Sequence, residues 1–132
     1  MLLANAVALL HGVTVLFMLT GSLLALRRPG LLYLHAPMAL AILALALAGQ
    51  PCPLTDLELA LRDAAGAAPY TGGFLGHYLL APFGVDVRTT AAQVGIHVTA
   101  VVPNLVGYGL AASRGIRRAG VRTGRPAGRR AG

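Results

Sequence analysis

The sequence predicts an all-α integral membrane protein in which three transmembrane helices carry an extracytoplasmic cap of two short helices. Three stretches of the chain contain no charged side chain: residues 2–26, 31–49 and 89–113. Roughly 20 apolar residues in a helix cross the hydrocarbon core of a bilayer. A mean hydropathy of +0.70, with only 11% charged residues, agrees with this class and argues against a soluble domain.

The positions of the arginines predict the orientation in the membrane. The chain has eleven basic residues, and all of them are arginine. Arg27 and Arg28 follow the first span and seven more follow the third, whereas all four acidic residues lie between the second span and the third. By the positive-inside rule, the N-terminus and residues 50–88 are extracytoplasmic and the C-terminus is cytoplasmic. A composition rich in Ala, Gly and Arg but without Lys is typical of GC-rich bacteria, which places the protein in a bacterial inner membrane.

The spans and the cap are expected to form a single membrane domain, residues 1–113. Thr55 and Glu58 fit a capping box, which predicts a helix over residues 56–65 that stops at Gly66. Within this helix Glu58 also stands four positions before Arg62, which is the favourable order for a helical ion pair.

A second short apolar helix is predicted over residues 73–81. It is too short to span, so we expect it to lie in the outer interface or to tuck back against the bundle. The remaining residues, 114–132, form a basic tail rich in Arg, Gly and Pro, a composition that predicts disorder. Next to a membrane such a tail is attracted to anionic lipid, and nucleic-acid binding is not expected.

Polar residues of the spans and of the outer segment follow a family pattern. Its densest part is C-P-L-T-x-x-E-x-x-L-R, from Cys52 to Arg62. Over roughly residues 3–112 the chain is similar to domain-of-unknown-function family 2784, a family of small bacterial membrane proteins. The resemblance implies the fold and topology described above and no activity, since the family has none assigned. The polar residues in the pattern are His11, His35, Cys52, Thr55, Glu58, Arg62, His77, Tyr78, Asn104 and Tyr108.

Histidines within the apolar segments are the most informative candidates for a ligand site. His11 and His97 each lie eight residues into a span that runs inward, roughly 12 Å below the outer face. At one level on parallel helices, two imidazoles could bind a metal or both faces of a haem b, and His77 could approach from the cap. His35 enters from the opposite side of the membrane. The alternative to ligand binding, for each of these histidines, is a hydrogen bond between helices. His97 lies outside the family pattern.

The single cysteine of the chain, Cys52, is the candidate nucleophile. Together with Glu58, Arg62 and His77 it is expected on the outer side, where a histidine and a carboxylate could activate a thiolate. Because Cys52 stands between two prolines, the sequence predicts no helix N-terminus beside its thiol. Two alternatives for Cys52 are a small buried residue at the mouth of the bundle and a ligand to a metal or at the edge of a haem.

No residue pattern in the chain identifies a catalytic site. The sequence therefore favours a non-enzymatic accessory or structural component of a membrane assembly, with a protein partner or a second copy beside the lipid bilayer. Two alternatives remain open: a haem- or metal-binding redox protein using His11 with His97 or His77, and a thiol-dependent membrane enzyme centred on Cys52.

Overall fold

The computed structural model describes residues 1–123, and in this part of the chain it contains helices, turns and loops but no strand. Three helical segments are long and apolar enough to cross a membrane: α1 (Leu2–Leu24), the segment Pro29–Leu47 that contains α2 (Leu32–Leu47), and residues Thr90–Gly115 of α4 (Thr90–Thr123). A short 3-10 turn, η1 (Pro29–Leu31), joins α1 to α2. These helices confirm the three predicted spans.

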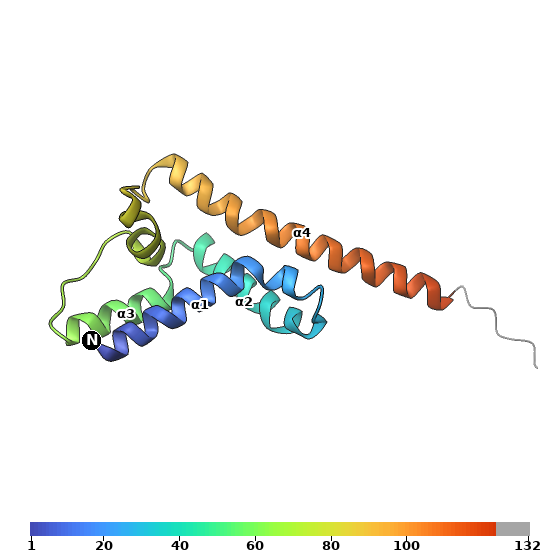
Figure 1. Ribbon diagram of the computed structural model, residues 1–132, viewed down its shortest axis with the longest axis horizontal. Helices are drawn as coiled ribbons and strands as arrows, with labels where there is room; N and C mark the ends of the chain where they lie inside the picture. Colours follow the sequence, from blue (N-terminus) through green and yellow to red (C-terminus); the bar gives the residue numbers. More distant parts are fainter. Residues whose placement is uncertain (124–132) are drawn as a thin grey trace, which may run out of the picture.

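The first span, α1, is the central helix of the molecule. It packs against α2, α3 and α4, whereas the backbones of the other helices stay apart (Figure 1). Figure 1 shows α3 lying beside the N-terminal half of α1, and α4 approaching the C-terminal half of α1 before it runs on beyond it. The N-terminal half of α1 therefore packs against α3 and the C-terminal half against α4. Each of these two contacts contains a group of buried polar residues, described below.

The first cap helix, α3 (Pro53–Ala64), begins earlier than the capping box predicted. Cys52 is the N-cap, and its carbonyl accepts hydrogen bonds from the backbone N–H groups of Thr55 and Asp56 at 2.9 and 3.1 Å. Pro53 occupies the first helical position, where its fixed φ suits the helix and its missing N–H leaves nothing unsatisfied. The prediction of Thr55 as N-cap was wrong, because the proline allows the helix to start two residues before it.

The end of α3 agrees with the sequence. Gly66 has a φ of 69°. The N–H of Ala67 bonds to the carbonyl of Arg62 at 2.9 Å, and that of Gly66 to the carbonyl of Asp63 at 2.8 Å. This pair of bonds is a Schellman motif, and its left-handed position favours glycine. Gly66 therefore ends the helix, as predicted.

The second cap element is helical but is not a regular α-helix. Residues 75–80 form a π-helix, η2 (Leu75–Leu80), followed by a 3-10 turn, η3 (Ala81–Phe83), and by Gly84 at a φ of 70°. Gly76 lies against Val87, which would be only 3.0 Å from a Cβ at that position. Two short helices thus form the cap, and the second has a wider turn than predicted.

The last helix runs beyond the predicted end of the third span at residue 113. Helix α4 continues to Thr123, so the prediction of disorder from residue 114 was wrong for this stretch. The alanines and arginines that follow the span favour helix, so a basic composition alone does not end it. Residues 124–132 of the predicted tail lie outside the described part of the chain.

In a soluble protein most large apolar side chains are buried, whereas in this protein most of them are exposed and several polar side chains are buried. Among the residues whose side chains are described, the buried hydrophobic ones are Ala4, Ala25 and Phe74. Leucines and valines of all three spans face outward, and Leu2, Leu9 and Leu105 have exposed fractions of 84%, 71% and 67%. A surface this apolar is stable in contact with lipid, which supports the transmembrane assignment.

Candidate functional site

Among the side chains that the structure describes, five polar ones are buried, and all of them lie along α1 or against it. They are His11, Ser22, His35, Thr55 and Glu58. Because a buried polar group needs a hydrogen-bond partner, these residues mark where the fold is specified most strictly. They fall into two groups. We call the group at the C-terminal half of α1 the crossing cluster; it consists of Ser22 and His35 with Asn104 and Tyr108. We call the group beneath η2 the cap cluster; it consists of His11, Thr55 and Glu58 with the aromatic residues Tyr70, Phe74 and Tyr78.

The crossing cluster joins all three spans through His35. Its Nδ1 lies 2.6 Å from the Tyr108 hydroxyl, and its Nε2 lies 3.3 Å from the carbonyl oxygen of Met18. A carbonyl only accepts, so Nε2 carries the proton; in the neutral ring, Nδ1 then accepts the Tyr108 hydroxyl proton. The amide of Asn104 donates to the same Met18 carbonyl at 2.8 Å. The carbonyl oxygen of Met18 in α1 thus accepts hydrogen bonds from His35 of α2 and from Asn104 of α4.

Small residues allow the helices of the crossing cluster to come close together. Ser22, fully buried, donates from its hydroxyl to the carbonyl of Pro103 at 3.3 Å. A Cβ at Gly107 would collide with Ser22, and one at Gly21 would collide with the ring of His35. These contacts assign His35, Asn104 and Tyr108 to interhelical hydrogen bonding, which is the use that polar residues commonly have within membranes.

The cap cluster is centred on Glu58 of α3, which is 0% exposed. Its Oε1 accepts a hydrogen bond from the hydroxyl of Tyr78 at 2.5 Å, while its Oε2 has no hydrogen-bond partner among the described residues. The Tyr70 hydroxyl lies in the field of the same carboxylate but makes no well-formed hydrogen bond. A fully buried carboxyl group with one oxygen left without a hydrogen bond is an unusual feature, because buried polar atoms normally have partners.

Burial and the Glu58 carboxylate raise the pKa of both tyrosines in the cap cluster. Burial is the larger cause for each phenol, and Glu58 opposes its ionisation. Arg62 has its guanidinium carbon 5.4 Å from the centre of the Tyr70 ring. Within the described structure Arg62 stacks on this ring without forming the predicted ion pair with Glu58, and its Nε has no hydrogen-bond partner there.

His11 connects the cap cluster to the first span. Its ring stacks on Phe74 of the cap, with centroids 4.1 Å apart and planes at 29°, and its side chain is only 5% exposed. Its Nε2 lies 3.5 Å from the Sγ of Cys52, and its Nδ1 has no partner among the described residues. Cys52 is the N-cap of α3, where the helix dipole favours negative charge. The expectation that no helix N-terminus lies beside this thiol was therefore wrong.

The histidines predicted to share a ligand do not meet. His77 stacks on Tyr70 with ring planes at 8°. His97 is exposed on α4, and its Nδ1 bonds to the carbonyl of Gln93 at 2.7 Å. The neighbour of His11 is Cys52, not His97 or His77. Nowhere in residues 1–123 do three or more His, Cys, Asp or Glu side chains gather in a way that could hold a metal ion.

Two members of the cap cluster were not candidates on chemical grounds. Phe74 carries no catalytic or metal-binding group and the Tyr70 phenol belongs to no catalytic motif, but the two rings stack on His11 and His77. Spacing along the chain gave no hint of the contact between Phe74 and His11, because it joins the cap to the first span, 63 positions earlier in the sequence. The family resemblance, which covers roughly residues 3–112, extends over both aromatic residues but does not indicate what they contact.

The fold and its buried polar contacts define a polytopic α-helical membrane protein. Within that class, the chain belongs to the family described as "Protein of Unknown function (DUF2784)", whose sequence model matches residues 1–109. The matched region contains both clusters in full and ends within α4, just after Tyr108. No curated protein and no solved structure matches the chain.

Proposed function

We propose that the protein is a non-enzymatic accessory or structural component of an assembly in the bacterial inner membrane, with its N-terminus outside and its C-terminus in the cytoplasm. The outer half of α2 carries this proposal. From Leu40 to Leu47 every residue except Leu45 is exposed, so this half of a span has almost no neighbour in its own chain. A bundle this thin leaves a place for another helix.

The composition of the outer half of α2 suits a helical partner. Ala41, Ala44 and Ala48 follow the spacing i, i+3, i+7 and so share one face. In lipid, helices associate through close packing at small residues, because apolar side chains gain little by leaving lipid for protein. Ser22, His35 and Asn104 of the spans already form hydrogen bonds within the chain, whereas this alanine face is free to act as a contact surface.

Native extraction in mild detergent tests the proposal. Full-length protein should migrate as part of a larger complex, and Ala44→Leu should weaken that complex by obstructing the alanine face. Ala46→Leu is the matched control, because the same substitution then lies on the other side of the helix. A protein that migrates as a single chain in gentle detergent, and that yields no cross-linked partner in native membranes, would contradict the accessory role.

Thiol chemistry at Cys52 is a second candidate function, and the contact of Cys52 with His11 favours it. An imidazole 3.5 Å from a thiol can take its proton, and the N-terminus of α3 favours the resulting thiolate. Such a site also needs a group that orients the imidazole, and the free Nδ1 of His11 shows none among the described residues. This is why the candidate ranks second.

Alkylation of Cys52 by a soluble maleimide separates the two candidates. If His11 activates the thiol, His11→Ala should slow the reaction at neutral pH several-fold, whereas His97→Ala, which changes an exposed histidine, should not. Equal rates in all three proteins would leave Cys52 as a packing residue. A haem or metal has less support, because His11 is covered by Phe74 while His97 points away; a colourless, metal-free preparation, made with haem available, would end that alternative.

A further inference from the structure

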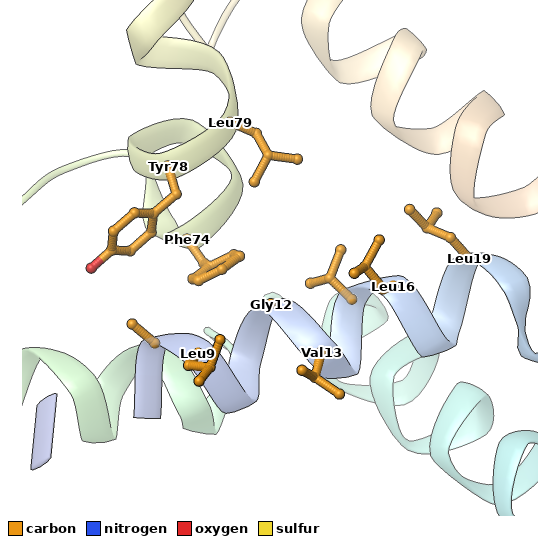
Figure 2. Close-up of a pocket in the computed structure, with 10 residues that line it drawn as sticks. Leu9, Gly12, Val13, Leu16, Leu19, Phe74, Tyr78 and Leu79 are labelled. Carbon is orange, nitrogen blue, oxygen red and sulfur yellow. The ribbon is translucent and has the colours of Figure 1, made fainter. Parts of the chain in front are cut away.

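An apolar groove runs along α1 beneath the cap. It has a volume of about 550 Å³, and its lining is almost wholly apolar. Figure 2 shows the α1 side chains forming one wall, with Phe74, Tyr78 and Leu79 of the cap above them and α4 at a distance on the far side. The lining residues are Ala8, Leu9, Gly12, Val13, Val15, Leu16, Leu19, Phe74, Tyr78 and Leu79.

Gly12 makes the floor of the groove. A Cβ at this position would meet Phe74 at 3.5 Å, an ordinary contact, so a larger side chain here would extend into the space that the groove now leaves open. Leu9, Leu16 and Leu79 along its sides have exposed fractions of 71%, 63% and 43%. The groove is therefore open to its surroundings, which for a membrane span are lipid.

Charges on α3 locate the groove within the bilayer. Asp56 and Asp63 are exposed on α3, which lies beside the N-terminal half of α1 (Figure 1). A carboxylate facing lipid is costly, so this end of α1 must lie at the boundary between lipid and water. From Ala8 to Leu19 the groove then extends inward by about 16 Å, close to half of the roughly 30 Å hydrocarbon core.

We propose that the groove binds one acyl chain of a phospholipid from the leaflet on the side of α3. Its length is that of a single leaflet, its walls are apolar, and it opens to lipid. A helix is about 10 Å across and rigid, whereas an acyl chain is thin and can follow the groove between the side chains that line it. The occupant is thus a single flexible chain, and Tyr78 links it to the cap cluster through the hydrogen bond to Glu58.

Photo-crosslinking in a bilayer tests this proposal independently of any protein partner. The full-length protein is placed in phosphatidylcholine nanodiscs with a small fraction of phospholipid that carries a diazirine on one acyl chain. Adducts should concentrate on residues of the groove, such as Leu16 and Leu79, several-fold above equally exposed residues of α4 such as Val98 and Val102. Labelling spread evenly over all exposed apolar residues would overturn the proposal, because ordinary boundary lipid would explain it.

Variants that fill the groove sharpen the result. Gly12→Leu should lower the labelling of Leu79 several-fold, and Gly95→Leu on α4, where a Cβ meets nothing within 4 Å, should leave it unchanged. If Gly12→Leu fails to fold, Leu16→Trp blocks the same space from a side chain that is already 63% exposed. Undiminished labelling in a folded blocking variant would also overturn the proposal.

Discussion

The hydroxyl of Tyr78 donates a hydrogen bond to the fully buried carboxylate of Glu58, with 2.5 Å between the two oxygens. This bond joins the π-helix of the cap to α3, and it gives Glu58 its one hydrogen-bond partner among the described residues. Because the same tyrosine lines the groove along α1, the order of the cap and the shape of the groove depend on one another.

Removing this hydroxyl should destabilise the cap. Tyr78→Phe leaves the ring in place but deprives a buried carboxyl group of its partner, which costs about 1–3 kcal/mol of unfolding free energy. Thermal unfolding in detergent measures the change, and Tyr33→Phe is the matched control because Tyr33 is 88% exposed. A Tyr78→Phe protein as stable as the parent would show that Glu58 is satisfied in another way.

High pH should destabilise the cap. The pKa of Tyr70 and of Tyr78 is raised in the folded protein, by burial first and by the Glu58 carboxylate second. A raised pKa means that the unfolded chain loses these protons first, so stability is constant below the ordinary tyrosine pKa of about 10 and falls as the pH rises above it.

Phenolate absorbance followed with pH checks this expectation. The parent should show tyrosines that ionise late, Tyr70 and Tyr78 among them, and a fall in melting temperature over the same alkaline range. In the double variant Tyr70→Phe, Tyr78→Phe, that fall should become smaller, although the protein starts from a lower stability. A parent whose melting temperature is flat in alkali would contradict the role given to the buried carboxylate.

The spans could be predicted from the sequence because a run without charge is a direct consequence of the bilayer. The stop of α3 at Gly66 could be predicted for an equally local reason, the left-handed backbone that glycine allows. The start of α3 was misplaced because two local signals competed: the Thr55–Glu58 spacing suggested a cap, but Pro53 fits the first turn two residues earlier. Here the proline outweighed the capping box.

The two clusters are harder to predict because they depend on which helices are neighbours. His11 was matched with His97 by depth, yet depth does not fix the rotation of a helix or the angle between two helices. In the structure α3 takes the place beside the N-terminal half of α1, so His11 meets Cys52. The periodicity of the sequence does not predict this arrangement, because it depends on how the amphipathic helix α3 packs against α1.

Close packing at the crossing cluster should make Gly21 intolerant of substitution. A Cβ at Gly21 would collide with the buried ring of His35, and overpacking of this kind costs about 1–3 kcal/mol. Gly95→Ala is the control: its Cβ meets nothing within 4 Å, and alanine favours helix by up to about 1 kcal/mol over glycine. Unfolding in detergent should therefore shift in opposite directions, and equal shifts would contradict the packing argument.

The orientation in the membrane should follow the arginines. A reporter enzyme active only in the cytoplasm, fused after Gly132, should be active, whereas the same reporter inserted at Ala67, directly after α3, should be inactive. The physical reason is that Arg27, Arg28 and the arginines after the third span resist translocation, while Asp56 and Asp63 lie exposed on the other side. Changing both Arg27 and Arg28 to Ala should weaken this preference, while Arg62→Ala, outside the spans, should not.

The opposite pair of reporter results would reverse the leaflet assigned to the groove, because α3 and the groove lie at the same end of α1.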